Sequence, residues 1–373
     1  MANNNNKDKC NVPHLRFPEF SGEWKKYSLG EVADFVKERI STDKLTLTTY
    51  VSTENMRSDF GGINPAISIP NNTNVIHYKK RDVLLSNIRP YLRKAWSANY
   101  DGGCSADVFV FRAKHITPFF LYYIIANDTF INYVMSGAKG VKMPRGDKEQ
   151  MLKYTFSIPT MEEQNKISHI LHLLDDRIST QNKIIEKLET LIKGISALCL
   201  KNSTLTGKWV KLGDICQITT GKLDANAMVE DGAYPFFTCA ERPFRINEYA
   251  FNTEALLISG NGANLGYINY YKGKFNAYQR TYVLDKFTED IQFVRFILKV
   301  NLPIRIAIER STSNTPYIVL STLAGMKLFI PPKSLQQCIT NLLLSIEAKL
   351  SIHTALLVDY SNLKSYLLQQ MFI

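Results

Sequence analysis

The chain has 373 residues, 45% of them hydrophobic and 21% charged, so its composition is that of a globular protein with room for two domains. Its longest uninterrupted apolar run, residues 119–126, is too short to cross a bilayer, and no apolar leader opens the chain. Six cysteines without a CxxC pair argue against a disulfide scaffold or a cysteine zinc site. We therefore expect a cytoplasmic protein without a membrane or metal role. Lysine and arginine exceed the acidic residues by 11, which favours a polyanionic partner such as nucleic acid.

The first globular segment, residues 1–158, is predicted to mix α and β structure. Residues 107–111 are rich in β-forming side chains, and an amphipathic helix is expected from Pro118 to Met135. Two polar clusters in this segment are candidates to face DNA, with simple surface turns as the alternative. The first cluster holds Lys79, Lys80, Arg81, Asn87, Arg89, Tyr91, Arg93 and Lys94, and the second holds Lys139, Lys142 and Arg145.

Residues 159–201 predict one long helix. Thr160 and Glu163 have the spacing of a capping box, directly after Pro159. Apolar residues then follow the three-and-four steps of a coiled-coil heptad, at positions 167, 171, 174, 178, 185, 188, 192 and 195. A helix of about 40 residues is about 60 Å long. The seam position that this apolar pattern skips is Gln181.

The second half of the chain repeats the first, which predicts two homologous domains in tandem. Residues 158–167 and 330–339 are alike and lie 172 positions apart, and Leu171 and Leu343 keep the same offset. The openings also match, with Trp24 before Leu29-Gly and Trp209 before Leu212-Gly. The interiors differ, so a shared frame carries two different contents. The expected boundaries are 202–330 for the second globular segment and 331–373 for the second long helix.

The second globular segment offers its own candidates. A strand is expected at residues 280–284 and a helix near Ile291–Val300. The polar residues placed like those of the first segment are Asn261, Asn264, Tyr267, Arg280, Arg310 and Asn314. Lysine is a compact charge suited to phosphate, so we assign Lys79, Lys80, Lys139 and Lys142 to the DNA backbone. Arginine and asparagine can grip guanine and adenine in bidentate fashion, so we assign Arg89, Arg93, Asn261, Asn264 and Arg310 to base reading.

The second long helix repeats the heptad seam of the first. Its apolar residues stand at 339, 343, 346, 350, 357, 360, 363 and 367. The skipped position is His353, 172 residues after Gln181. The two polar residues either face solvent or form a pair that fixes the register of two packed helices.

Enzymatic motifs are absent from the sequence. No GxxxxGK[ST] phosphate loop, HExxH pair or complete dinucleotide fingerprint occurs. Glu347 and Lys349 have a nuclease-like spacing, but they fall in the predicted coiled coil and are interpreted as a solvated helix face. The basic surplus lies on the globular segments, since residues 1–158 hold 22 basic and 15 acidic side chains whereas 159–201 hold six of each.

This arrangement resembles the specificity subunit of type I restriction–modification systems. The resemblance rests on the opening Leu15-Arg-Phe-Pro-Glu-Phe with Gly22-x-Trp24, on the twin Ile-Pro-x-x-x-x-Gln helix starts at 158 and 330, and on the ending Leu367-Leu-Gln-Gln-Met-Phe. Such subunits often have Glu-Gln at the helix start; the first copy has Glu163-Gln164, whereas the second has Leu335-Gln336.

The resemblance implies a fold and a function. The fold would be α+β, with two target recognition domains that each read half of a split site in double-stranded DNA, and two long helices that pair antiparallel with pseudo-two-fold symmetry and set the spacer. The chain would bind no cofactor. Two modification subunits would carry S-adenosylmethionine and methylate adenine, and restriction subunits, present or absent, would use ATP and Mg. The alternatives are a stand-alone DNA-binding regulator and an enzyme with an unrecognised site.

Overall fold

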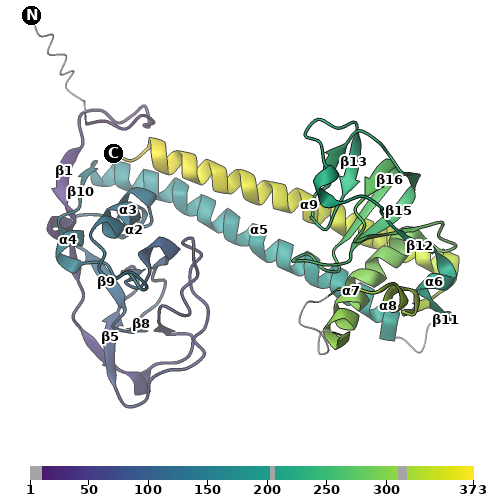
Figure 1. Ribbon diagram of the computed structural model, residues 1–373. Helices are drawn as coiled ribbons and strands as arrows, with labels where there is room; N and C mark the ends of the chain where they lie inside the picture. Colours follow the sequence, from purple (N-terminus) through teal and green to yellow (C-terminus); the bar gives the residue numbers. More distant parts are fainter. Residues whose placement is uncertain (1–10, 202–205, 310–316) are drawn as a thin grey trace, which may run out of the picture. The chain divides into compact units, whose positions relative to one another are not determined.

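The computed structural model describes residues 11–201, 206–309 and 317–373 (Figure 1). The chain forms two compact units, one of Met1–Thr180 with Leu357–Ile373 and one of Gln181–Leu356. Each unit contains one α+β domain and part of both long helices, so the architecture is the one expected from the repeat.

The first domain is built on short strands in three small sheets. The strands are β1 (Lys25–Ser28), β2 (Ala33–Phe35), β3 (Arg39–Ser41), β4 (Tyr50–Val51), β5 (Asn74–Tyr78), β6 (Val83–Ser86), β7 (Ala95–Ser97), β8 (Gly102–Cys104), β9 (Val108–Ala113) and β10 (Thr155–Ile158). The sheet orders are β2-β9-β6-β7, β3-β5-β8-β4 and β1-β10. Only β4 and β8 pair in parallel among the described strands of this domain. The strand expected at 107–111 is β9.

The helix expected from Pro118 to Met135 is two helices, so that prediction was wrong in one respect. The helices of this domain are α1 (Leu29–Val32), α2 (Pro118–Ile125), α3 (Asp128–Ser136) and α4 (Lys148–Leu152), with short 3₁₀ turns η1 (Thr42–Lys44) and η2 (Pro90–Leu92). The break falls at Asn127, whose side chain accepts a hydrogen bond from the backbone N–H of Thr129 and so caps α3. Asparagine is a strong N-cap residue and favours a new start over a continuous helix.

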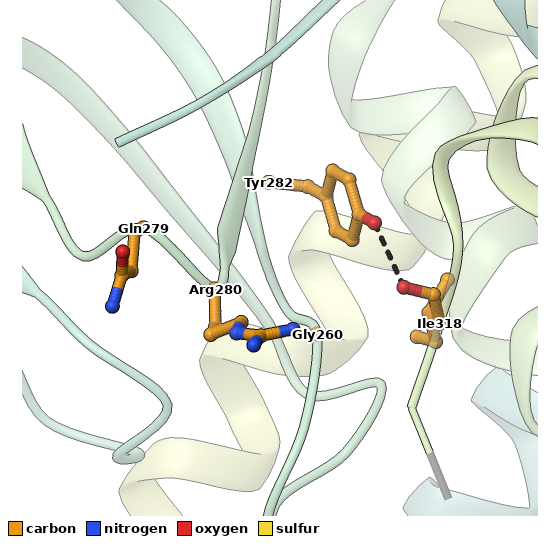
Figure 2. A pocket seen from close by; sticks show the side chains of 5 residues that line it. All are labelled: Gly260, Gln279, Arg280, Tyr282 and Ile318. Carbon is orange, nitrogen blue, oxygen red and sulfur yellow. Dashed lines mark hydrogen bonds between the residues drawn. The ribbon is translucent and has the colours of Figure 1, made fainter. Parts of the chain in front are cut away.

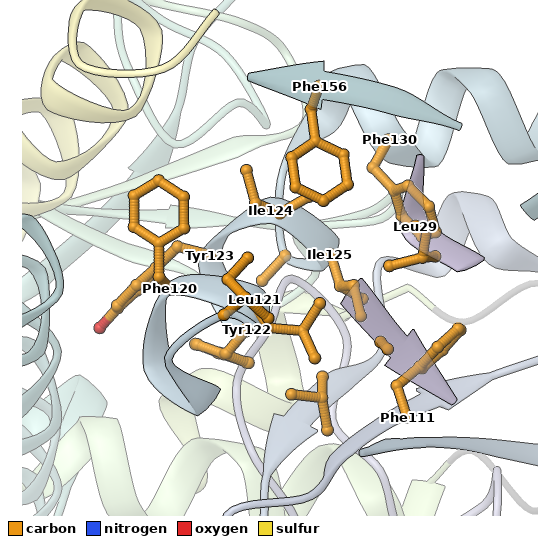
Figure 3. Packing of buried hydrophobic residues seen from close by; sticks show 14 of the residues in the cluster. Leu29, Phe111, Phe120, Leu121, Tyr122, Tyr123, Ile124, Ile125, Phe130 and Phe156 are labelled. Atoms are coloured by element: carbon orange, nitrogen blue, oxygen red, sulfur yellow. The ribbon is translucent and has the colours of Figure 1, made fainter. Parts of the chain in front are cut away.

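The core of the first domain lies between α2, α3 and the sheet that contains β6 and β9 (Figure 3). Phe120, Phe130 and Phe111 are fully buried there. The last residues of the chain join this core, because Met371 is buried in it and the ring of Phe372 stacks on Phe120 at 5.0 Å. The first domain is therefore completed by the end of the second long helix.

The second domain repeats this plan with longer strands. They are β11 (Lys208–Lys211), β12 (Gln217–Thr220), β13 (Tyr234–Phe237), β14 (Phe244–Ile246), β15 (Phe251–Ser259), β16 (Ile268–Ala277), β17 (Thr281–Asp285) and β18 (Lys327–Ile330). Their orders are β12-β17-β15-β16-β13-β14 and β11-β18. The helical elements are α6 (Leu212–Ile215), η3 (Ala225–Ala227), α7 (Ile291–Glu309) and α8 (Leu320–Ala324). The expected strand at 280–284 is β17. Helix α7 extends well beyond the expected Val300, because Leu302 and Ile306 continue its buried face.

The two long helices are α5 (Met161–Lys201) and α9 (Lys333–Gln370), and they run side by side in opposite directions (Figure 1). In the first unit Lys364 of α9 pairs with Asp175 of α5, and in the second unit His353 of α9 contacts Gln181 of α5. The predicted seam is correct except at Leu363, which is exposed; Lys364 takes the inner position instead. Among the described helices, α9 alone has the length and apolar composition to cross a membrane, and here it packs against α5.

The two tryptophans at the domain openings are not equivalent, contrary to the sequence match. Lys25 pairs with Ile158 in the first domain, and Lys208 pairs with Ile330 in the second. Since Ile158 and Ile330 are repeat partners, Trp24 corresponds to Gly207 rather than to Trp209. Accordingly Trp24 is only 3% exposed, whereas Trp209 is 60% exposed.

Candidate nucleic-acid interface

The first domain brings two of its predicted loops together. The loop after β6 and the loop before α4 are joined by a bridge between Ile88 and Arg145, and the N–H of Arg89 donates to the carbonyl of Pro144 at 2.8 Å. Arg89 and Arg93 adopt left-handed backbone angles, with φ of 50° and 56°, on either side of the 3₁₀ turn η2. This tight turn folds the loop back on itself and keeps Arg89 exposed beside the second loop.

Lys79, Lys80 and Arg81 lie elsewhere in the domain. They form the turn between β5 and β6, at the start of β6, whereas the loop from Asn87 begins at its other end. Four strand residues separate the two places by roughly 13 Å. The Lys79 ammonium also pairs with Glu38 at 3.1 Å. The two halves of the first predicted cluster therefore lie at opposite ends of β6.

Several candidate side chains around the joined loops are occupied by neighbours. Arg93 pairs with Asp128 at 3.1 Å and lies over the ring of Phe60. The Lys94 ammonium donates to the carbonyl of Thr53 at 2.6 Å. Lys139 pairs with Asp147 at 2.9 Å, and the hydrogen bond from Lys139 lowers the pKa of that carboxyl. Tyr91 and Lys142, by contrast, are exposed. Asn87 has a buried amide oxygen without a hydrogen-bond partner among the described residues.

The second domain joins the corresponding loops in the same way. Asn261 forms a bridge with Tyr317, and the N–H of Ile318 donates to the carbonyl of Gly260 at 2.9 Å. A hollow of about 240 Å³ opens here, and Figure 2 shows Arg280 beside Gly260, with the Tyr282 hydroxyl donating to the carbonyl of Ile318 at 2.7 Å. Tyr267 is exposed at the end of the loop. The predicted residues Arg310 and Asn314 lie outside the described residues.

Cys239 is a part of this site that the sequence did not reveal. Its thiol donates to the side-chain oxygen of Asn261 at 3.0 Å, and its carbonyl accepts from the side-chain nitrogen of Asn264 at 3.0 Å. Both asparagines therefore brace the loop against the end of β13. A lone cysteine 22 positions away from Asn261 carries no sequence signal for this contact.

The repeated glutamine at the start of each long helix ties that helix to its domain. Gln164 accepts a hydrogen bond from the N–H of Thr117 at 2.8 Å and donates to the carbonyl of Pro159 at 3.0 Å. Gln336 accepts from the N–H of Asp290 at 3.0 Å and donates to the carbonyl of Pro331 at 2.9 Å. Both side chains are buried, which explains why this position is the same in both copies.

The predicted capping box at Thr160 is only half formed. The Thr160 hydroxyl accepts from the N–H of Glu163 at 3.4 Å. The Glu163 carboxylate does not return to the cap, because it accepts two hydrogen bonds from Arg16, each 2.8 Å long. The opening motif thus fastens the start of α5. The equivalent position in the second domain is the apolar Leu335.

A second pair of repeat partners also links helix to domain. Asp175 of α5 accepts from the hydroxyl of Tyr123 in α2 at 2.8 Å. Glu347 of α9, 172 positions later, accepts from Arg295 and Lys299 of α7 at 2.5 and 2.8 Å. The interpretation of Glu347 as part of a solvated helix face was therefore wrong, because its ion pairs with Arg295 and Lys299 hold it against α7.

Glu347 makes stability pH-dependent in a defined direction. Burial raises the pKa of Glu347, but hydrogen bonds from Lys299 and Arg295 outweigh it, so the pKa lies below its ordinary value of 4.5. Its stabilisation is then present above about pH 4.5 and is lost as pH falls through the lowered folded-state value. We expect Glu347→Gln to cost about 1–3 kcal/mol at pH 7 and less at roughly pH 3.5. Urea unfolding at both pH values measures this; an equal cost at both would contradict it.

The polar pair at the centre of the helix seam is in contact. The Nδ1 atom of His353 lies 2.6 Å from the side-chain oxygen of Gln181, and Gln181 is buried. A histidine nitrogen at this distance donates its proton to the amide oxygen. The pair joins repeat partners across the two helices.

Comparison with known proteins assigns the class of the chain. A family model described as the type I restriction modification DNA specificity domain matches residues 21–190 and 207–358. The chain belongs to this family, that of the DNA specificity subunits of type I restriction–modification systems, which are the non-catalytic subunits.

Two curated relatives show how far the similarity extends. The type I restriction enzyme EcoDI specificity subunit of Escherichia coli is 43% identical over 132 residues, which are 35% of this chain and 29% of that protein. The MjaIX specificity subunit of Methanocaldococcus jannaschii is 25% identical over 258 residues, which are 58% of this chain and 60% of that protein. The matched parts span less than two thirds of either relative.

Solved structures share the fold. The S subunit of a type I restriction–modification system from M. genitalium superposes with a TM-score of 0.72 at 16% identity, covering 97% of this chain and 99% of that one. A chain from work on complex assembly and conformational transition of the type I R-M system gives 0.52 at 19% identity, covering 93% and 97%. The α+β arrangement with two paired long helices is therefore a known one.

Proposed function

We propose that this chain recognises a bipartite DNA target for a type I restriction–modification complex, with one half-site read by each domain. The observation that carries the proposal is that both domains join two loops by one backbone bridge, an arrangement called the loop frame below. Ile88 is joined to Arg145 in the first domain, and Asn261 is joined to Tyr317 in the second. The frame repeats while its side chains differ, as expected of two readers with different half-sites.

The assignments of single residues remain part of this proposal. Lys80 and Lys142 are exposed and suit phosphate contacts, as do Lys79 if it leaves Glu38 and Lys139 if it leaves Asp147. Arg89 is exposed and free to reach a base edge. Arg93, Asn261 and Asn264 must exchange the bonds described above for bonds to bases. The Gln181–His353 pair is proposed to fix the register of α5 against α9, because a shift of one helical turn would separate the two polar groups.

The partners follow from the subunit class and from the helix surfaces. Large apolar side chains are exposed along α5 and α9, including Leu173, Leu191, Leu342, Ile352 and Val358. Exposed apolar side chains along a helix pair suit a protein partner. We propose that two modification subunits dock there and bind S-adenosylmethionine, and that restriction subunits, where present, use ATP and Mg. The complex would act on DNA in the cytoplasm, not at a membrane.

An exchange of recognition segments tests the proposed function. We expect that replacing residues 209–330 by the matching segment of another family member changes one half of the methylated sequence and leaves the other half intact. The reason is that each domain has its own core and its own loop frame. Methylome sequencing of a host that carries the chimera and the modification subunits gives the result.

The reciprocal chimera, with residues 24–158 replaced, is the matched control and should change the other half only. If either exchange altered both halves, or if the parent complex methylated no bipartite sequence, the proposed function would have to be abandoned.

A further inference from the structure

In each domain two residues flank the loop that follows β6 or β15, and the first of these two positions is equivalent in both domains. Ser86 pairs with Val108 at the end of β6, as Ser259 pairs with Thr281 at the end of β15. One residue beyond, the N–H of Asn87 donates to the carbonyl of Asp107, and the N–H of Gly260 donates to the carbonyl of Arg280, both at 2.8 Å. Asp107 and Arg280 therefore occupy equivalent positions.

The second of the two flanking positions is also equivalent in both domains. Arg145 faces the first loop through its bridge with Ile88, and Tyr317 faces the second loop through its bridge with Asn261. Arg145 and Tyr317 lie 172 positions apart, the offset of the whole repeat. Each loop is thus held between two positions, Asp107 and Arg145 in the first domain, and Arg280 and Tyr317 in the second.

Each domain has one arginine at these two positions. In the first domain it is Arg145, at the second position, and in the second domain it is Arg280, at the first position. In the first domain Arg145 is 55% exposed and its guanidinium lies 3.3 Å from the Asp107 carboxylate, which is 39% exposed. In the second domain Arg280 is exposed and lines the hollow beside Gly260 (Figure 2). The Arg280 guanidinium makes no hydrogen bond or ion pair with the part of the chain that the structure describes. Each domain therefore presents one guanidinium beside its loop.

We propose that Arg145 and Arg280 are the specificity-determining side chains of the two domains, each reading a guanine in its own half-site. This inference rests on the proposed function and goes beyond it by naming the base. Arginine binds the O6 and N7 atoms of guanine with two parallel hydrogen bonds. A phosphate contact suits Arg145 poorly, because the Asp107 carboxylate beside it would repel the phosphate. Asp107 instead acts as a positioning residue that leaves one edge of the Arg145 guanidinium open for a base.

Two other candidates around the frame are less available for this role. Arg93 is bound to Asp128 and stacked on Phe60, and Asn264 is bonded to the carbonyl of Cys239. Using them for bases requires breaking internal bonds first. Arg280 needs no such step, and Arg145 keeps its ion pair with Asp107 while the open edge of its guanidinium meets the base.

The experiment uses the specificity subunit assembled with its modification subunits. Methylome sequencing of a host with the parent complex first gives the cognate sequence. Binding is then measured for the cognate duplex and for every single-base-pair substitution, at several salt concentrations, with Arg145→Lys, Arg280→Lys and Asp107→Ala. Lysine keeps the charge but not the planar fork. Lys26→Ala and Lys327→Ala are the controls, because both are exposed cations on the small sheets β1-β10 and β11-β18.

We expect each arginine variant to lose discrimination at one G·C pair by roughly 5- to 150-fold, in one half-site only, with an unchanged salt slope. Asp107→Ala should weaken discrimination at the same pair as Arg145→Lys, and Asp107→Glu should restore it. The controls should leave base preference unchanged.

Two results would overturn the inference while leaving the proposed function in place. One is a cognate sequence in which a half-site lacks any G·C pair. The other is a lysine variant that keeps full base preference, which would make that arginine a phosphate contact. A parent complex that recognises no DNA sequence would instead refute the proposed function itself.

Discussion

Replacing Arg16 by alanine is expected to lower the free energy of unfolding by about 3 kcal/mol, the lower end for removing one partner of a buried ion pair. The Glu163 carboxylate at the start of α5 is fully buried, and Arg16, 13% exposed, supplies its two hydrogen bonds. Without Arg16 the carboxylate stays buried and unpaired. Urea unfolding of the parent and of Arg16→Ala measures the difference.

A double variant separates the ion pair from simple packing. Arg16→Met combined with Glu163→Leu removes both charges and copies the apolar residue that stands at the equivalent position, Leu335, in the second domain. We expect the double variant to regain most of the lost stability, because replacing a buried pair by apolar side chains is often neutral. If it were as unstable as Arg16→Ala, the loss would come from packing of the opening segment rather than from the unpaired Glu163.

Replacing Gln336 by alanine is expected to cost about 2–5 kcal/mol, because the part-buried N–H of Asp290 and the buried carbonyl of Pro331 both lose their partner. Gln164→Ala should cost a similar amount through Thr117 and Pro159. Thermal and urea unfolding measure both effects. Gln164→Glu is the informative control, since it keeps the acceptor for the N–H of Thr117 but loses the donor to the carbonyl of Pro159. Gln336 also donates to the Glu289 carboxylate at 2.9 Å, so a glutamate there would add charge repulsion.

These two glutamines are also expected to act on separate units. Gln336→Ala should destabilise the second domain and leave hydrogen exchange in the core around Phe120 unchanged, and Gln164→Ala should do the reverse with the core around Phe293. Equal loss of protection in both cores from either variant would show that the two units unfold together.

The frame of the fold could be predicted from the sequence, because it is encoded in regular signals. The heptad steps define α5 and α9 nearly to the residue, and the offset of 172 between Gln164 and Gln336 identifies two domains. The sequence prediction failed where contacts between residues distant in the sequence determine the local structure. The break at Asn127, the diversion of Glu163 to Arg16, and the pairing of Glu347 with α7 depend on residues distant in the sequence.

The sequence predicted which loops form the candidate site but not which side chains contact one another there. Arg145 and Arg280 were among the expected residues, since exposed basic side chains near glycine and proline mark turns that can face DNA. Asp107, Cys239 and Tyr317 could not be found, because nothing in their neighbourhood distinguishes them from ordinary strand ends. The equivalence of Asp107 with Arg280 appears only when the strand registers of β6–β9 and β15–β17 are compared.

The packing of Met371 and Phe372 into the first domain has a consequence for biosynthesis. The ribosome makes the core residues Phe120 and Leu171 first, but the segment Leu357–Ile373 that completes their unit is made after the whole of the second unit. The intervening 181–356 take roughly 10–35 s to translate at 5–20 residues per second. Throughout that interval the nascent first unit lacks part of its apolar cover. The second unit is complete in sequence when the interval ends, before residues 357–373 are made. We therefore expect the domain encoded second to reach its native state first, and the domain encoded first to depend on chaperones until residues 357–373 have been made.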